Sequence, residues 1–258
     1  MTSADLPAHT ERDFVADADG TRQTFLLLTP REPRTVETLV IALHGHGAHQ
    51  EQFLTPVIYN DALGATVRLA QAENLLYATP EYRGNSWMNA AAESDVRQVI
   101  EILRRDFPVR RVILLGGSMG GTSVLIYAAL NPEGIDGVVS LCPATDMAML
   151  YRELEHGPYD FIPEALRAGY GGTPEERPAE YARRSSRRHA GRLTMPVTIV
   201  HGDADAVLSV SHSRELVAGL RAGGTPVDYT EIAGGDHDSP VQYCAAALAA
   251  MLGRLVPR

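Results

Sequence analysis

Gly116-Gly117-Ser118-Met119-Gly120-Gly121 is the stretch from which the fold of this 258-residue chain can be inferred. An apolar run, Val112-Ile113-Leu114-Leu115, comes just before it, and residues 122–130 after it have the composition of a helix. The pattern predicts a serine on a sharp turn between a buried strand and a helix. Glycines flank the serine because a strained turn leaves no room for side chains beside it.

The spacing Gly-x-Ser-x-Gly in this context is typical of a nucleophile elbow, which presents a reactive serine hydroxyl. The helix that follows directs its N-terminal N–H groups toward the serine, where negative charge develops during acyl transfer. Met119 comes directly after the serine and is a candidate to donate one backbone N–H to that charge. The alternative is a glycine-rich turn that only packs tightly.

Strands and helices alternate from residue 39 onward, which predicts an α/β fold with a mostly parallel sheet of about eight strands and helices on both faces. Before this alternation, residues 1–13 are expected to be loose, and Asp19-Gly20 is expected to turn a hairpin. Strands are expected at 14–16, 25–28, 39–43, 75–79, 111–115, 137–141, 197–200 and 227–232, and helices at 62–73, 93–107, 122–130, 209–222 and 240–255.

Residues 143–192 interrupt the alternation and hold only short helical pieces, at 147–154 and 163–168. We interpret this stretch as an insertion over the carboxyl edge of the sheet, serving as a lid or pocket wall. The alternative is a surface excursion with no role toward a substrate. No linker or internal repeat divides the chain, so residues 1–258 are expected to form one domain.

Composition narrows the functional classes. The net charge of −9 argues against nucleic acid or an anionic membrane as the main partner. The only cysteines, Cys142 and Cys244, form no disulfide framework, which favours a reducing compartment. Residues 1–7 lack the features of a secretory signal, and no apolar run approaches the roughly 18 residues that span a bilayer. We therefore expect a cytoplasmic monomer or homodimer.

A serine hydroxyl needs a general base, and the base needs an orienting carboxylate. On this fold both should follow strands, in the order serine, acid, histidine. Asp203 and Asp205 follow the strand at 197–200, and His237 follows the strand at 227–232. His201 ends its strand inside the core and is interpreted as a hydrogen-bonded structural histidine.

These motifs resemble the α/β-hydrolase superfamily over residues 36–255, and within it the prolyl-oligopeptidase-like and dienelactone-hydrolase-like esterases. In those proteins a His-Gly-x-x-Asp loop ends on the catalytic acid. The resemblance implies that Asp205 is the acid in the triad Ser118, Asp205 and His237, and that Asp203 shapes its loop.

The loop His44-Gly45-His46-Gly47 also matches the superfamily, where such a loop supplies the second oxyanion N–H. The resemblance implies that His46 gives this N–H, with Gly47 as the alternative, and that the ring of His44 ties the loop to neighbouring backbone. A metal site is the competing interpretation, because His44, His46 and His49 have the spacing of metallo-β-lactamase-like ligands. Ala48 stands where that family has an aspartate and no second ligand cluster follows, so we expect no metal and no cofactor.

The loop at residues 80–86 resembles the Tyr-Arg-Gly-Ser loop that lies beside the active site in prolyl-oligopeptidase-like domains. Arg83 is a candidate to bind a substrate carbonyl or carboxylate, and a structural salt bridge is the alternative. Trp87 either lines the pocket or packs in the core.

The function implied is a serine hydrolase that cleaves an ester of a small acyl substrate through an acyl-enzyme. Ester cleavage is preferred because no extra N-terminal domain of the kind that confers peptidase selectivity precedes the core. A prolyl-oligopeptidase-like peptidase or aminoacyl hydrolase is the first alternative, and a thioesterase or lactonase the second. A binding module without catalysis on the same fold is a fourth possibility.

Overall fold

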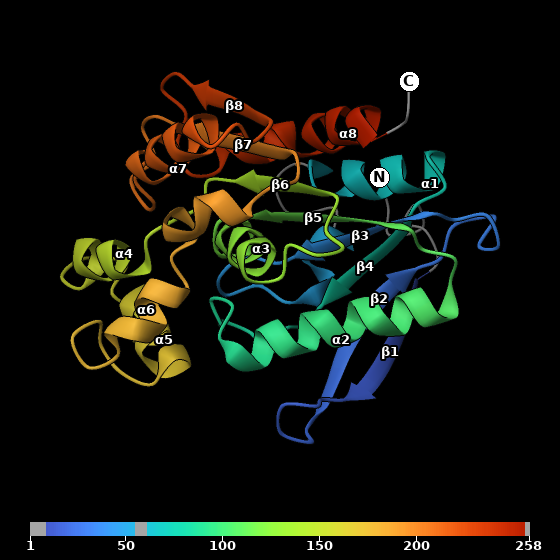
Figure 1. Cartoon of the computed structure of the whole chain (residues 1–258), viewed down its shortest axis with the longest axis horizontal. Coiled ribbons are helices and arrows are strands. Elements are labelled where there is room, and N and C mark those ends of the chain that lie inside the picture. The colour runs from blue at the N-terminus through green and yellow to red at the C-terminus, as the bar shows by residue number, and fades with distance from the viewer. Residues whose placement is uncertain (1–8, 55–60, 256–258) are drawn as a thin grey trace.

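Eight strands form one sheet in the computed structural model, which describes residues 9–54 and 61–255 (Figure 1). Their order across the sheet is β1-β2-β4-β3-β5-β6-β7-β8. The strands are β1 (His9–Val15), β2 (Arg22–Leu28), β3 (Thr38–Leu43), β4 (Leu76–Pro80), β5 (Arg111–Gly117), β6 (Gly137–Leu141), β7 (Val197–Gly202) and β8 (Val227–Ile232). The sheet from β4 to β8 is parallel, while β1, β2 and β4 pair antiparallel.

β3, β5 and β7 are buried along almost their whole length, as their largely apolar sequences predict, while β8 at the edge of the sheet is only partly buried. All six residues of β3 are buried, and β5 lies between β3 and β6 at the centre of the sheet. Because these strands are parallel, their carboxyl ends share one edge, where the loops after β5 and β7 meet the loop after β8.

One expectation is wrong at the N-terminus. Residues 9–13 are not loose but belong to β1, which pairs with β2 from His9 opposite Leu28 to Val15 opposite Arg22. Arg12 in this strand also forms an ion pair with Asp106, at 2.6 Å. The ladder and this contact fix a stretch whose polar composition hides its strand character. Residues 1–8, including those in which we expect no secretory signal, lie outside the described residues.

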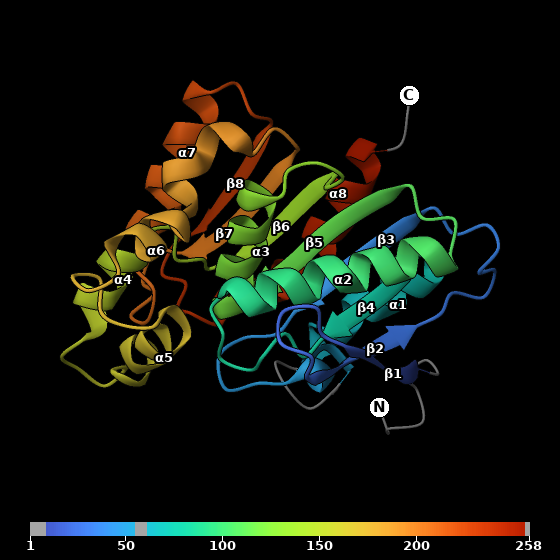
Figure 2. The ribbon, with the colours of Figure 1, turned by 60° about the horizontal axis from the view of Figure 1, so that its bottom comes forward.

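Helices cover both faces of the sheet, as the alternation predicts, and each face has its own apolar core. Figure 2 shows one face with α2 (Ala90–Asp106), α3 (Met119–Leu130) and α7 (Ser211–Ala222) packed over it. The opposite face is covered by α1 (Gly64–Ala72) and α8 (Cys244–Leu255), with the short 3-10 helices η2 (Gln50–Leu54) and η5 (Ser239–Tyr243) nearby. This is the α/β-hydrolase arrangement, and the predicted fold class is confirmed.

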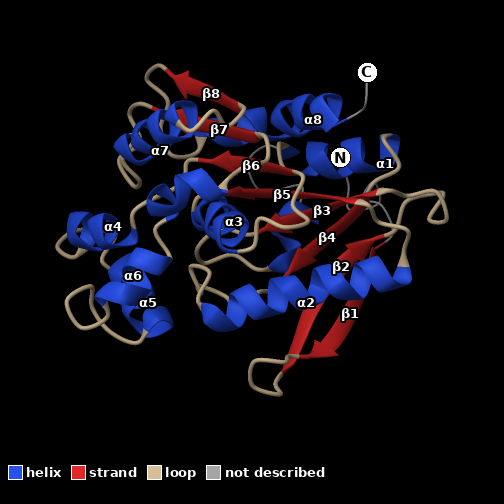
Figure 3. Cartoon of the chain, viewed as in Figure 1, coloured by secondary structure: helices blue, strands red, loops and turns tan. Residues whose placement is uncertain are grey.

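The insertion forms a small helical cluster beyond the carboxyl edge of the sheet (Figure 3). It contains α4 (Met147–Leu154), α5 (Phe161–Tyr170), α6 (Pro178–Arg183) and the 3-10 helix η4 (Ser186–Arg192). The sequence predicts α4 and part of α5 but not α6 or η4. Arg184, only 1% exposed, joins this cluster to Glu93 of α2 through an ion pair of 2.6 Å.

No helix within residues 9–54 and 61–255 is both long and apolar enough to cross a membrane.

Candidate active site

Ser118 lies at the tip of the turn between β5 and α3, with φ 57° and ψ −122°. Non-glycine residues avoid positive φ, so the surrounding backbone must hold this conformation. The turn is also too tight for side chains at Gly116, Gly120 and Gly121. A Cβ on Gly116 would stand 2.4 Å from the carbonyl carbon of Gly120, and one on Gly120 would stand 2.1 Å from the carbonyl oxygen of Leu43. The predicted elbow geometry is therefore present.

A chain of hydrogen bonds joins Ser118 to His237 and His237 to Asp205. Nδ1 of His237 lies 2.7 Å from Oδ2 of Asp205, and Nε2 lies 2.9 Å from Oγ of Ser118. Because an ionised carboxylate only accepts, Nδ1 carries the proton and donates it to Asp205. In the neutral ring Nε2 then carries no proton and accepts a hydrogen bond from the serine hydroxyl. An unprotonated Nε2 is what a general base requires.

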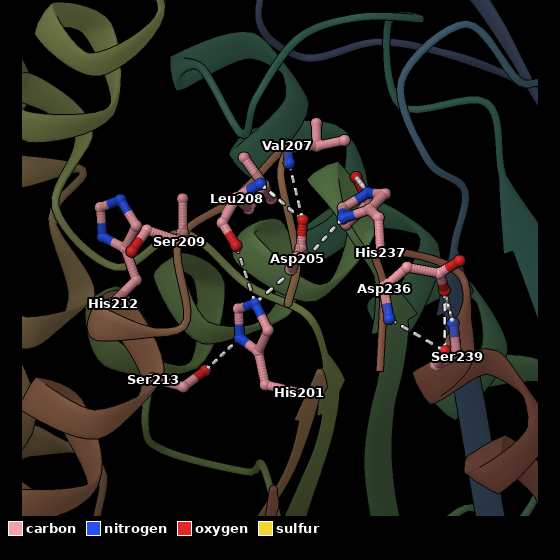
Figure 4. A network of polar contacts seen from close by, with 12 residues as sticks. His201, Asp205, Val207, Leu208, Ser209, His212, Ser213, Asp236, His237 and Ser239 are labelled. Atoms are coloured by element: carbon pink, nitrogen blue, oxygen red, sulfur yellow. Dashed lines mark hydrogen bonds and ion pairs between the residues drawn. The ribbon is translucent and has the colours of Figure 1, made fainter. Parts of the chain in front are cut away.

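Asp205 is saturated with donors, and its side chain is fully buried. Its Oδ1 accepts from the backbone N–H groups of Val207 and Leu208, at 2.8 and 2.9 Å. Its Oδ2 accepts from both His237 and His201 (Figure 4). Burial by itself would raise the pKa of Asp205, but the hydrogen bonds from His201 and His237 outweigh it and hold the pKa well below the ordinary value. The group is thus kept ionised.

The sequence does not predict the contact between His201 and Asp205. Nε2 of this fully buried ring lies 2.9 Å from the carbonyl oxygen of Leu208 and 3.2 Å from Asp205 Oδ2. Both oxygens accept, so Nε2 bears the proton, and Nδ1 lies 2.7 Å from the hydroxyl of Ser213. The expected hydrogen-bonded histidine is confirmed. Its contact with the acid could not be expected, since the motif fixes only the spacing from His201 to Asp205.

The other aspartates of the two loops shape the backbone. Asp203 accepts from the N–H of Gly234 at 2.7 Å, which ties the loop after β7 to the loop after β8. Asp236 accepts from the N–H and the hydroxyl of Ser239, at 2.9 and 2.7 Å, and so fixes the chain that leaves His237 (Figure 4). Asp203 does not contact His237, in keeping with the loop-shaping role implied for it.

The loop after β3 lies next to Ser118 and is held from several sides. The N–H of Gly45 donates to Gln52, and the N–H of Gly47 donates to Oδ1 of Asn85 at 2.7 Å. The ring of His44 contacts the carbonyl oxygens of Gly45 and Glu81, both at 2.9 Å, which confirms the tie expected for it.

The histidines of the alternative metal motif bond to separate partners. His49 contacts the carboxylate of Glu81, while His46 contacts Trp87. The described residues hold one group of three metal-ligand side chains with ligand atoms within 4.8 Å of one another: Cys142, Asp205 and His237. Burial raises the pKa of the Cys142 thiol, which keeps it protonated and a poor ligand.

Arg83 and Trp87 have structural roles of different kinds. The guanidinium of Arg83 forms ion pairs with Asp95 and Asp19, both at 2.5 Å, which is the structural salt bridge of the two alternatives. Trp87 is fully buried, and its indole N–H donates to Nδ1 of His46 at 3.2 Å. Trp87 therefore supports a residue of the cavity wall.

A cavity of about 250 Å³ opens onto Ser118 and His237. Its wall is mainly apolar and draws on both the core and the insertion. Core residues in it include Phe53, Leu63, Leu141 and Val241, and the insertion contributes Tyr159, Phe161 and Ile162. Among the described residues, Asp238 is the one carboxylate in this wall, and no lysine or arginine lines it.

Comparison with known proteins finds a matching family model and several relatives. The family model of the prolyl oligopeptidase family matches residues 65–251. An uncharacterized peptidase of Bacillus subtilis, YtmA, is 25% identical over 82% of this chain and 79% of its own length. A monoacylglycerol lipase of Mycolicibacterium smegmatis is 28% identical over 78% of this chain and 81% of its own. A puromycin-hydrolyzing peptidase of Mycobacterium tuberculosis superposes with a TM-score of 0.76 at 19% identity over 95% of this chain, which spans only 39% of that larger protein.

Proposed function

Because this chain belongs to the prolyl oligopeptidase family and is a serine hydrolase, we propose that it hydrolyses small uncharged carboxylic esters through an acyl-enzyme. The observation that carries the proposal is the continuous hydrogen-bond chain from Ser118 through His237 to the buried Asp205. It supplies a nucleophile, a base and an orienting acid in one line.

In the first half-reaction Oγ of Ser118 attacks the ester carbonyl while Nε2 of His237 takes its proton. Asp205 stabilises the resulting imidazolium and keeps Nδ1 directed toward itself. The imidazolium then passes the proton to the alcohol oxygen, which leaves as the carbon–oxygen bond breaks. In the second half-reaction His237 takes a proton from water, which attacks the acyl-serine. The imidazolium then returns the proton to Oγ of Ser118 as the acyl–oxygen bond breaks, which releases the acid and restores the enzyme. These steps use only groups of the chain and water.

Two backbone donors are proposed for the oxyanion. Met119 is the first residue of α3, so its N–H has no acceptor within the helix. His46 provides the second, because the N–H of Gly47 is already bonded to Asn85. Loss of one such donor typically lowers kcat by about 10²–10³-fold.

The cavity supports a small, neutral substrate. Its volume of about 250 Å³ is below the range of roughly 300–1,000 Å³ that is usual for drug-sized ligands. Its apolar wall suits a short acyl chain, and without a cation it has no counterpart for a carboxylate. The lipase among the relatives, which acts on an ester, is consistent with this choice.

Peptide or aminoacyl hydrolysis is the second candidate, and the family membership itself favours it. The same triad can protonate an amine leaving group as well as an alcohol. The two candidate activities differ in which groups the enzyme must bind beyond the scissile bond. A comparison of cleavage rates for different substrates therefore distinguishes them.

A fluorophosphonate probe followed by a substrate panel tests the proposal. We expect labelling of Ser118 in the folded protein, loss of labelling in Ser118→Ala, and turnover of p-nitrophenyl acetate and butyrate. Matched thioesters, lactones and aminoacyl 4-nitroanilides form the rest of the panel. Faster cleavage of the anilides would make the peptidase the main activity, and an unlabelled Ser118 in folded protein would exclude a serine hydrolase mechanism.

A further inference from the structure

The imidazole of His46 is a feature that the proposed mechanism leaves unused. His46 supplies its backbone N–H to the oxyanion, while its ring stands in the wall of the cavity that opens onto Ser118. The ring lies between two aromatic side chains, with centroid distances of 6.0 Å to Trp87 and 5.1 Å to Phe161. One neighbour is buried in the core, and the other belongs to the insertion and is 44% exposed.

The contact with Trp87 fixes the protonation of this ring. An indole N–H can only donate, so Nδ1 of His46, at 3.2 Å, must be the acceptor and carries no proton. The ring is therefore neutral, with its proton on Nε2. Burial, together with the nearby His44, lowers the pKa of His46 and acts in the same direction.

Trp87 is itself held in place for this task. Its backbone adopts φ 47°, and its carbonyl oxygen accepts a hydrogen bond of 2.7 Å from the hydroxyl of Tyr170 in α5. The core that buries the indole holds the ring, and the hydrogen bond from the insertion holds the backbone that carries it. The indole N–H cannot turn to another acceptor unless the core around it repacks.

The protonated Nε2 of His46 has no hydrogen-bond acceptor among the residues that the structure describes. It is not sealed in the interior, and His46 lines the cavity. A directed donor in a largely apolar wall selects a ligand that brings an acceptor, because a ligand without one leaves the N–H unpaired. The acceptor should be uncharged, since the ring is neutral and the wall, in the part of the chain that the structure describes, carries one carboxylate, Asp238, and no lysine or arginine.

We propose that the His46 ring binds a second oxygen of the substrate, which makes the preferred substrates esters with an ether, hydroxyl or carbonyl oxygen near the scissile group. His46 contacts the substrate, and Trp87 acts through it as a positioning residue. This inference rests on the proposed esterase function and narrows its substrate class.

Two isosteric substrate pairs test the inference, each differing by one CH₂ replaced by oxygen. p-Nitrophenyl methoxyacetate and butyrate vary the acyl side, and 2-methoxyethyl and butyl butyrate vary the alcohol side. His46→Phe keeps a ring but removes the donor, while His46→Gln keeps an N–H donor. Each variant is compared with the parent enzyme on the same substrate, so differences in intrinsic reactivity cancel.

In one of the two pairs, His46→Phe should reduce kcat/KM for the oxygen-bearing ester about five- to tenfold more than for its alkyl partner, and His46→Gln should restore part of the difference. Equal losses within both pairs would overturn the inference and leave the esterase function standing. Absence of both fluorophosphonate labelling and ester turnover in the parent would instead overturn the proposed function, and the substrate class with it.

The protonation state has its own readout. ¹⁵N NMR of the imidazole, assigned by its loss in His46→Phe, should show a neutral ring protonated at Nε2 at pH 7.5, and Trp87→Phe should populate the other tautomer. A ring protonated at Nδ1 in the parent would contradict the inference whatever the activity. Circular dichroism checks that Trp87→Phe is folded.

Discussion

Oδ2 of Asp205 accepts a hydrogen bond from the buried His201 at 3.2 Å, in addition to the one that it accepts from His237. The acid of the proposed triad thus has two imidazole donors on one oxygen and two backbone donors on the other. Four donors leave this carboxylate no freedom to rotate. Its direction toward His237 is fixed before any substrate binds, which is the preorganisation that such catalysis requires.

Asp205→Asn should reduce kcat by on the order of 10⁴-fold, as in other triads with this change. The cause here is structural as well as electrostatic, because either orientation of the amide places its NH₂ group against N–H donors. Asp203→Asn is the matched control, and it should retain most of the activity. Steady-state kinetics on p-nitrophenyl butyrate measures both, and a greater loss in Asp203→Asn would mean that the acid is wrongly assigned.

His201→Ala should lower both stability and activity. It leaves a cavity in the core and removes one donor from Asp205, for an expected loss of about 2–4 kcal/mol in the free energy of unfolding. The loosened carboxylate should reduce kcat roughly ten- to a hundredfold. Ser213→Ala removes only the partner of Nδ1 and should cost about 1 kcal/mol with little change in kcat. Urea unfolding and kinetics on the same samples would refute the positioning role if His201→Ala kept its full kcat.

Acid should remove the stabilising contribution of Asp205. Its folded-state pKa is held below the ordinary value of 3.8 by His201 and His237, against the opposing effect of burial. Between the two pKa values the unfolded chain binds more protons than the native one, so the free energy of unfolding falls as the pH drops below about 4. Asn at position 205 cannot titrate. The stability difference between the parent and Asp205→Asn should therefore be present at pH 5 to 7 and shrink toward pH 3, and an unchanged difference across that range would contradict the assignment.

The glycines of the elbow offer a sharp steric test. Gly120→Ala directs a methyl group onto the backbone oxygen of Leu43, at 2.1 Å, which no side-chain rotation relieves. We expect destabilisation of at least about 1–3 kcal/mol. Gly117→Ala is the matched control, because its methyl group would meet Leu141 at an ordinary 3.7 Å. Equal urea midpoints for the two variants would show that the turn can open.

The sequence predicts the strands and loops that form this site better than it predicts the contacts between them. β3, β5 and β7 follow from largely apolar runs. The loops after β5, β7 and β8 carry Ser118, Asp205 and His237, and each of these motifs is local in sequence. The contacts from Trp87 to His46 and from Asn85 to Gly47 join residues about 40 positions apart. Such long-range contacts depend on how the loops pack, and the spacing of residues in the sequence does not predict them. The sequence predicts only the end of β1, at residues 14–15, and not residues 9–13, since an edge strand with polar residues lacks the apolar pattern.

The buried ion pair between Arg184 and Glu93 has a consequence for kinetics. Separating it would remove the shortest ion-pair contact of Glu93, whose side chain is only 15% exposed, although Arg184 would keep its pair with Glu180. Tyr170 adds a second tie, to the backbone at Trp87. We infer that these contacts anchor the insertion, part of which lines the cavity beside Ser118, so that it does not swing aside at a lipid surface. We therefore expect no interfacial activation: the rate against butyrate esters should saturate smoothly with the dissolved monomer and show no upward break where the ester begins to form droplets.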